Sequence, residues 1–208
     1  MNISTIQKSG GISLIAGSSL LILWSVLWTT LLPVAKRAQD PAAMVLSPNW
    51  VWIASIALAA VLLTIFGFIA VYSRFYSSAG ITGFLGFLFV ITAYILQAGQ
   101  ITWEVFVYPA ILSHGPSLPL FSESILRHHP MIGLFFIVFQ AVLAAGVILF
   151  SIALLRSKEF HKSAGIMILA GALIYAFGPM VSIYAAVLGV LILASGCSVL
   201  GFRLTGSK

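Results

Sequence analysis

The charged residues of this chain are confined to tails and short gaps between long apolar stretches. The chain has ten lysines and arginines and four aspartates and glutamates, and all but Glu104 lie between or at the ends of these stretches. An ionised side chain at the centre of a bilayer costs about 2.5–3.5 kcal/mol on insertion scales, so membrane-spanning segments exclude charge. The pattern predicts that lipid, rather than water, surrounds most of the chain.

Composition agrees with this interpretation and limits the partners. The chain is 61% hydrophobic and 7% charged, whereas a soluble domain has about 25% charged residues. A water-soluble fold with so few charges would expose large apolar patches and aggregate. The net charge of +6 does not indicate nucleic acid, because the basic residues are scattered rather than grouped on one face. We expect the lipid bilayer and other membrane protein subunits as partners.

Six stretches are long enough to cross a membrane, which takes about 20 apolar residues. The breaks between them carry proline, glycine or charge, including a polar turn at Arg74 to Ser78 and a short turn at Gly178-Pro179. The first stretch is longer than the core of a signal peptide, so we expect it to be retained as a span. The sequence predicts an all-α integral membrane bundle of six transmembrane helices in one domain over residues 1–208. The spans are residues 11–34, 50–73, 79–112, 130–155, 163–179 and 182–203.

The distribution of basic residues predicts the orientation. Cytoplasmic loops carry an excess of lysine and arginine. The side that holds both termini carries seven such residues, against three, Lys36, Arg37 and Arg127, on the other. Both termini are therefore expected in the cytoplasm, with loops 35–48 and 113–129 outside. The seven are Lys8, Arg74, Arg156, Lys158, Lys162, Arg203 and Lys208.

A short pattern of small residues recurs where the first, third and fifth stretches begin. Two small residues and an isoleucine are followed by a glycine, at Gly10-Gly11-Ile12 with Gly17, Ala79-Gly80-Ile81 with Gly86, and Ala164-Gly165-Ile166 with Gly171. One interpretation is three tandem helical hairpins, in which small residues let helix backbones approach closely. The other is that glycine is common in membrane helices and aligns by chance.

The third stretch is the most unusual. As one helix its 34 residues would be about 51 Å long, so it must project, tilt or break, with Gly99 and Pro109 as the expected weak points. Steps of three and four residues place a set of polar side chains on one face of its outer half. Lipid cannot satisfy such a face, so it must meet protein, water or headgroups. The set is Tyr94, Gln97, Gln100, Glu104 and Tyr108.

Glu104 has two interpretations. As a functional group it would be a proton relay, a cation ligand or a general base. Alternatively it lies at the interface, where Trp103 and Tyr108 also belong as anchors, and it pairs with Arg127 or Tyr108. On the functional interpretation, a small molecule or lipid would bind at Glu104, Gln97, Gln100, Tyr108 and His114.

Three histidines flank the predicted outer loop. His114, His128 and His129, together with Glu104, have side chains that zinc binds, and His128 and His129 are the candidate metal ligands. They are adjacent in sequence and show no HxxxH or HExxH spacing, so the identity of any metal, haem or pigment stays open. Within the spans, Gln140 is expected near the midplane, where it would bond to Gln97.

Two patches carry a resemblance. The opening Gly10-Gly11-Ile12 with Gly17, and the segment from Trp103 to Ala110, resemble small uncharacterised bacterial multi-pass membrane proteins. The resemblance implies a protein of the bacterial inner membrane and no particular activity.

Two functions of different class follow from these observations. The first is a non-catalytic accessory or scaffold subunit that packs against partner helices, favoured by the sparse polarity of the spans. The second is a binding protein for a small molecule or lipid, or a membrane enzyme, with a site around Glu104 and the nearby histidines. The sequence leaves open whether the protein is an enzyme.

Overall fold

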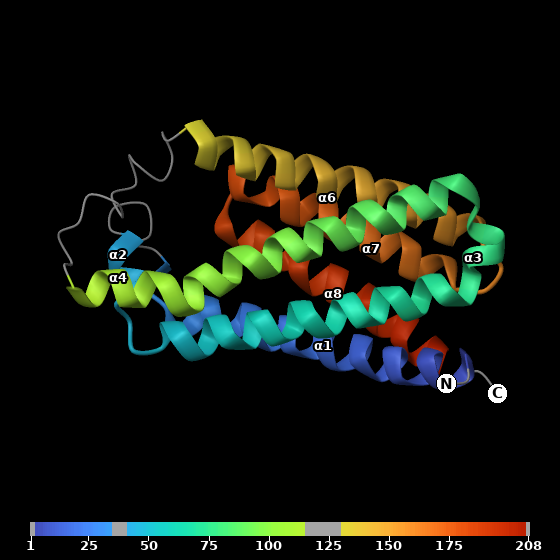
Figure 1. Ribbon diagram of the computed structural model, residues 1–208, viewed down its shortest axis with the longest axis horizontal. Coiled ribbons are helices and arrows are strands. Elements are labelled where there is room, and N and C mark those ends of the chain that lie inside the picture. Colours follow the sequence, from blue (N-terminus) through green and yellow to red (C-terminus); the bar gives the residue numbers. More distant parts are fainter. Residues whose placement is uncertain (1–2, 35–40, 115–129, 207–208) are drawn as a thin grey trace.

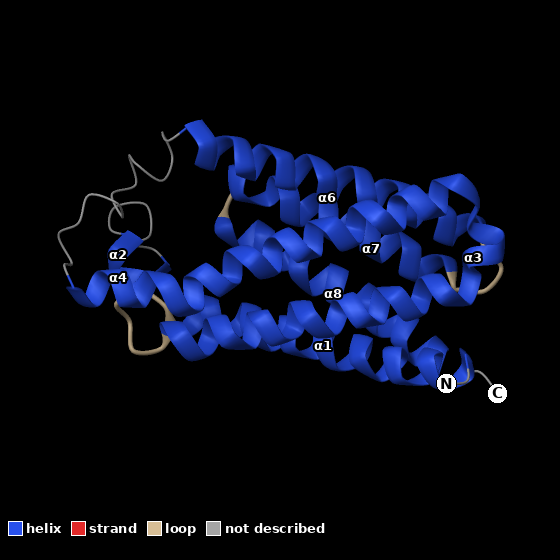
Figure 2. Cartoon of the chain, in the orientation of Figure 1, coloured by secondary structure: helices blue, strands red, loops and turns tan. Residues whose placement is uncertain are grey.

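The structure is a computed structural model that describes residues 3–34, 41–114 and 130–206, and its regular elements are all helical (Figures 1 and 2). A π-helical turn, Trp103–Val107, joins α3 to α4, and a 3-10 turn, Gly178–Met180, follows α7. The α-helices are α1 (Ile3–Leu31), α2 (Pro41–Val45), α3 (Trp50–Thr102), α4 (Tyr108–His114), α6 (Pro130–Arg156), α7 (Lys162–Phe177) and α8 (Ile183–Gly206).

Four helical runs in the described part of the chain are long and apolar enough to cross a membrane. They are Thr5–Leu31, Trp50–Leu112, Gly133–Arg156 and Ile183–Gly206, and Lys162–Phe177 is a shorter apolar helix. Every one of the four long runs exposes large hydrophobic side chains, for example Ile12, Phe66, Ile137 and Leu188. A surface of this kind indicates contact with a bilayer, since water does not favour large apolar patches.

The α3 helix contains a sharp reversal at Gly80. This residue has φ 58° and ψ −168°, in the region of positive φ that only glycine adopts readily. Figure 1 shows the chain running back along the molecule from this point, so α3 consists of a first arm (residues 50–79) and a second arm (residues 81–102). The 63-residue apolar run therefore contains two antiparallel segments.

The polar turn expected at Arg74 to Ser78 is wrong in position, because these residues are helical. The hydroxyl of Ser73 donates to the carbonyl of Ala70 at 2.8 Å, and that of Ser78 to Phe75 at 3.0 Å. Serine can continue a helix when its hydroxyl bonds to the preceding turn. The chain reverses at Gly80, the first residue after this segment at which the backbone can take a positive φ without strain.

The break expected near Gly99 or Pro109 is a π-helical turn that ends two residues before Pro109. Gly99 lies within a continuous helix. Proline lacks an N–H and its ring clashes with the carbonyl four residues earlier. At Pro109 that carbonyl belongs to Val105, inside the π turn. The wider turn removes the conflict and the chain continues into α4.

The helices form a closed bundle with two distinct ends. The start of α1, the Gly80 reversal and the end of α8 lie at one end, here named the terminal end, and α2 and α4 lie at the other, the α4 end (Figure 1). The most extensive pairings are α1 with α3, α3 with α6, α7 with α8, and α1 with α8. Ser18 and Ser198 share a hydrogen bond of 2.8 Å across the last pair.

Three helix pairs are in contact through glycine. A Cβ on Gly17 of α1 would lie 3.0 Å from the backbone of Thr64 in the first arm. A Cβ on Gly86 of the second arm would collide with the backbone of Phe150 in α6, and one on Gly171 of α7 with Leu193 in α8. Without a hydrophobic drive between helices in lipid, small residues are what allows such close packing.

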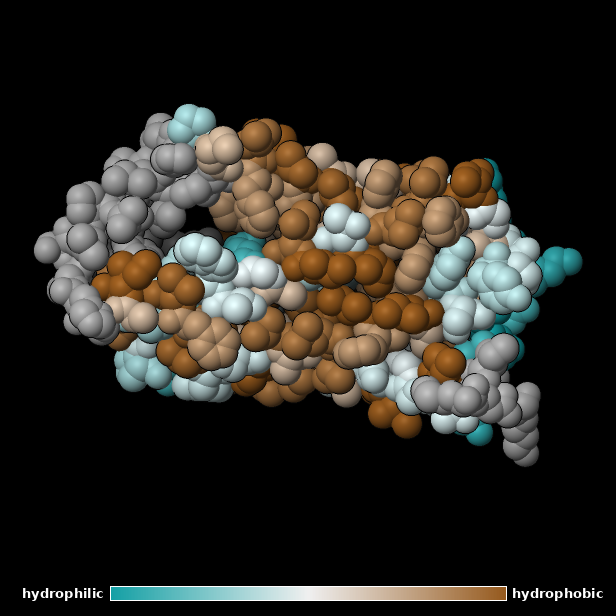
Figure 3. Space-filling view, in the orientation of Figure 1, coloured by the Kyte–Doolittle hydropathy of each residue, from teal (hydrophilic) through white to brown (hydrophobic). Residues whose placement is uncertain are grey.

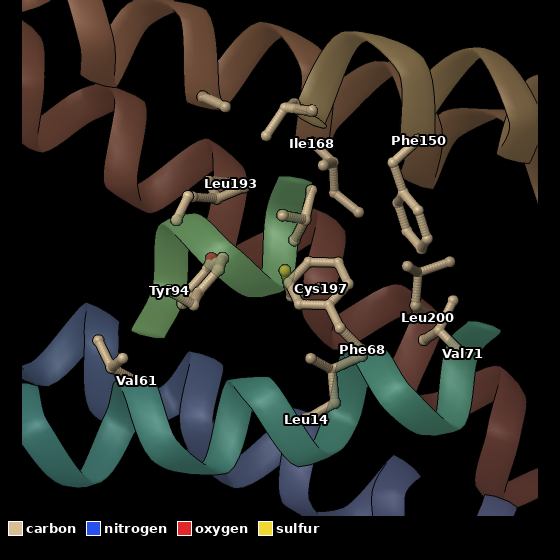
Figure 4. Packing of buried hydrophobic residues seen from close by; sticks show 14 of the residues in the cluster. Leu14, Val61, Phe68, Val71, Tyr94, Phe150, Ile168, Leu193, Cys197 and Leu200 are labelled. Carbon is tan, nitrogen blue, oxygen red and sulfur yellow. The ribbon is translucent and has the colours of Figure 1, made fainter. Parts of the chain in front are cut away.

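The centre of the bundle is filled by aromatic and aliphatic side chains. Phe68 makes an edge contact with Phe150 at a centroid distance of 5.5 Å and also lies 5.5 Å from Tyr94. Figure 4 shows Phe68 between Leu14 and Ile168, with Phe150 and Tyr94 on either side and side chains contributed by several helices. The space-filling view in Figure 3 is mainly hydrophobic over the middle of the molecule, with hydrophilic residues gathered towards the terminal end.

Candidate functional site

The candidate site lies at the α4 end, where the π turn holds Glu104. The Glu104 side chain is half-buried, and its Oε1 accepts a hydrogen bond from Gln100 Nε2 at 3.0 Å. The two residues are four apart, the spacing that places side chains together on one helix face. The structure thus joins two of the predicted site residues directly.

The backbone of the π turn explains a second contact. In this turn the N–H of Tyr108 donates to the carbonyl of Trp103, five residues earlier. The same register would pair the carbonyl of Glu104 with residue 109, which is a proline and has no N–H. That carbonyl instead accepts a hydrogen bond of 2.8 Å from Trp50 Nε1. The indole takes the place of the missing backbone donor.

Trp50 connects the first arm of α3 to the π turn that follows the second arm. It is the first residue of the first arm, is 8% exposed, and packs in a cluster with Ile53 and Leu112. Its bond to Glu104 spans 54 residues of sequence. π turns are frequent at functional sites. The combination of a π turn, a carboxylate and a backbone carbonyl held by a tryptophan hydrogen bond is therefore the most specific feature of the described chain.

The remaining residues of the predicted polar face separate into two groups. Gln97 and Tyr108 are half-buried, and Tyr108 packs against the cluster around Trp50. Tyr94 is buried in the central core beside Phe68 and does not belong with the others. The polar face therefore extends from Gln97 to Tyr108.

The histidines are only partly described. His114 is the last residue of α4, ten residues beyond Glu104, so a helical rise of 1.5 Å per residue separates their backbones by roughly 15 Å. Arg127, His128 and His129 lie outside the described residues. Within the described ranges no three His, Cys, Asp or Glu side chains gather closely enough to hold a metal.

The expected bond between Gln97 and Gln140 is wrong. The Oε1 atom of Gln140 is buried, and in the described chain it has no hydrogen-bond partner. A buried amide without a partner costs about 1–3 kcal/mol. Similar predicted depth in the membrane did not bring these two side chains together.

Sequence reasoning missed Trp50 and the π turn. Hydropathy cannot find a π turn, since the inserted residue leaves the apolar pattern intact. Pro109 did predict a weak point, because a proline inside a helical stretch requires local adjustment, but it did not predict that the adjustment is a π turn. Nothing in residue spacing could pair Trp50 with Glu104.

The chain was compared with family models, curated proteins and solved structures, and none matches it. The resemblance to bacterial multi-pass membrane proteins therefore identifies no family, and function has to be argued from the chain itself.

Proposed function

We propose that the chain crosses the bacterial inner membrane six times, with both termini in the cytoplasm. The reversal at Gly80 supports the count, since it divides the longest apolar run into two arms that each exceed 20 residues. The α7 helix has 16 residues, about 24 Å at 1.5 Å per residue, and with the turn that follows it makes the fifth crossing. The excess of lysine and arginine at the terminal end supports the orientation.

The spans are arranged as three tandem hairpins. The glycine six positions after each repeated small-residue pair, Gly17, Gly86 or Gly171, lies against the next spanning segment of the chain. A chance alignment of glycines would not give the same pairing three times.

The role that the packing supports best is that of a non-catalytic accessory or scaffold subunit. The observation that carries it is the central core, where Phe68, Phe75 and Phe150 are almost completely buried and the ring of Phe150 contacts both of the others. Transport proteins place polar groups and broken helices near the midplane, whereas the cluster around these rings consists almost entirely of aliphatic and aromatic side chains. The exposed apolar faces remain available for lipid and for partner helices.

Photocrosslinking from the exposed faces tests this role. A photoreactive amino acid is placed singly at Leu23 of α1, Leu88 of the second arm, Ile137 of α6 and Leu188 of α8, which are all exposed. A scaffold subunit should yield one membrane protein at fixed stoichiometry from a single face. Crosslinks to lipid alone from all four positions would contradict it.

A second function is favoured by the π turn. The carboxylate of Glu104 is half-buried, lies beside the amide of Gln100, and belongs to a turn that Trp50 holds by a hydrogen bond. Such a group suits a small molecule or lipid that offers a cation or a hydrogen-bond donor. The site would use Glu104, Gln100 and Tyr108, with Gln97 towards the membrane and His114 towards the surface. Any metal would additionally need His128 and His129.

Ligand retention separates the two functions. The purified protein is examined by absorption spectroscopy, metal analysis and mass spectrometry of bound lipids, and then compared with the Glu104→Gln variant. The amide keeps an oxygen for the bond from Gln100, so the fold should persist. A ligand lost from Glu104→Gln but kept in Glu159→Gln supports the outer site, and an unchanged ligand content refutes it.

A further inference from the structure

We propose that the terminal end holds a binding site for the phosphate group of an anionic phospholipid. The site is an open hollow of about 360 Å³ between three elements that are distant in sequence. Arg74 comes from the first arm, Lys158 and Glu159 from the turn between α6 and α7, and Arg203 from the last turn of α8. The proposal rests on the chain being a membrane protein and not on its role there.

The charges around the hollow favour an anion. Three cationic side chains line it against one carboxylate, Glu159. Arg74 Nε donates to Glu159 Oε2 at 3.0 Å, and its Nη1 donates to Gln7 Oε1 at 3.4 Å. These bonds orient the guanidinium, which is 35% exposed. Guanidinium groups bind phosphate oxygens through paired N–H donors.

The donors that remain are sufficient for a phosphate. A guanidinium carries five N–H groups, and Arg74 uses two of them on Glu159 and Gln7. Lys158 and Arg203 are exposed at the rim. A phosphate placed between the three would neutralise the excess positive charge that the single carboxylate leaves.

The position of Phe202 points to a lipid rather than a soluble phosphate. Phe202 lines the same hollow and is 63% exposed, next to Arg203 in sequence. Further along α8, towards its start, Val199 and Leu188 are exposed apolar side chains. A headgroup in the hollow would thus have its acyl chains beside an aromatic ring and apolar helices. Basic pockets between membrane helices on the cytoplasmic side are typical sites for anionic headgroups.

A thermal-shift titration tests the site. The full chain in neutral detergent is titrated with short-chain phosphatidylglycerol, with phosphatidylcholine of equal chain length, and with inorganic phosphate. We expect phosphatidylglycerol to raise the unfolding temperature at a lower concentration than the other two. Removing Arg203 and Lys158 together, as Arg203→Gln with Lys158→Gln, should raise the half-maximal concentration by about tenfold or more.

The chain offers a matched control. Arg156 and Lys162 are exposed at the same end and do not line the hollow. Arg156→Gln with Lys162→Gln removes the same charge and should shift the half-maximal concentration by less than about twofold, because exposed charges act mainly through a screened field. Glu159→Gln should tighten binding of phosphatidylglycerol.

The remaining outcomes contradict the proposal in distinct ways. Equal weakening by both double variants would show a diffuse positive surface and no site. An equal response to inorganic phosphate would show a soluble anion as the ligand, and an equal response to phosphatidylcholine would show that charge plays no part. A chain that stays monodisperse without detergent would instead refute the membrane proposal.

Discussion

At the scale of single residues, Pro109 determines the surroundings of Glu104. It withholds the backbone donor that the Glu104 carbonyl would otherwise meet in the π register, and the indole of Trp50 supplies it at 2.8 Å. The carboxylate is thereby held on a turn whose backbone is fixed from the opposite arm of α3. A functional carboxylate benefits from such positioning.

Trp50→Phe tests this bond. The ring volume is largely kept, but the carbonyl of Glu104 loses its donor, which should lower the free energy of unfolding by about 1–3 kcal/mol. Trp52→Phe is the control, since Trp52 Nε1 donates to Asn49 Oδ1 at an exposed site and should change stability by less than about 0.5 kcal/mol. Denaturant titration in micelles measures both, and equal losses would show that the indole bond is not responsible.

The side-chain contacts predicted correctly from the sequence were those that follow from helical spacing within one element. Glu104 and Gln100 were predicted on one face and do contact each other. The Gln97–Gln140 bond was not formed, because similar depth in a bilayer does not fix which way two helices turn their faces. Asn49 follows Pro48 and is a residue type that predicts a helix cap, yet its side chain makes no cap bond and accepts from Trp52 Nε1 instead.

At the scale of elements, Gly80 decides where α3 reverses. Its φ of 58° is the reason that glycine is needed here. Lack of space is not the reason, because a Cβ at this position would meet no heavy atom within 4 Å. Gly80→Ala should therefore destabilise the protein by about 1–2 kcal/mol through backbone strain alone. Gly99→Ala, also in open space but in a regular helix, should be stabilising by up to about 1 kcal/mol. Denaturant titration of the two variants measures the contrast, and equal effects would argue against strain at Gly80.

At the three hairpin glycines, Gly17, Gly86 and Gly171, substitution is limited by the space between helices and not by backbone conformation. A Cβ on Gly86 collides with the backbone of Phe150, so Gly86→Ala must separate the second arm from α6, at a cost of about 1–3 kcal/mol. Gly17→Ala and Gly171→Ala should behave alike if the three hairpins are equivalent. Gly133→Ala, with nothing within 4 Å, is the control for the same unfolding measurement. A neutral result at Gly86 would contradict the close approach.

Helix boundaries were predictable to within several residues, and the errors have physical causes. The α1 helix begins at Ile3 and not near Gly11, because a helix can extend past the membrane into water. The turn near Arg74 was misplaced because serines and an arginine resemble a loop by composition, although their side chains bond within the helix or to neighbouring elements.

At the scale of the whole molecule, the apolar surface and the charged terminal end follow directly from the order of charges in the sequence. The bundle brings the start of α1 and the end of α8 together, where a Cβ on Gly11 would lie 2.9 Å from the carbonyl of Gly201. Contacts of this kind join residues that are far apart in sequence, and hydropathy carries no information about them.

Cysteine accessibility in intact cells tests the central claim, that the α4 end lies outside the membrane and the terminal end in the cytoplasm. The only natural cysteine, Cys197, is buried and should give little background labelling. Single cysteines replace Leu46 and Ser182 near the α4 end, and Tyr76 and Lys158 at the terminal end, all exposed positions. We predict that an impermeant maleimide labels Leu46→Cys and Ser182→Cys in intact cells, and Tyr76→Cys and Lys158→Cys only after the inner membrane is opened. Labelling of Leu46→Cys and Tyr76→Cys from the same side would contradict the account.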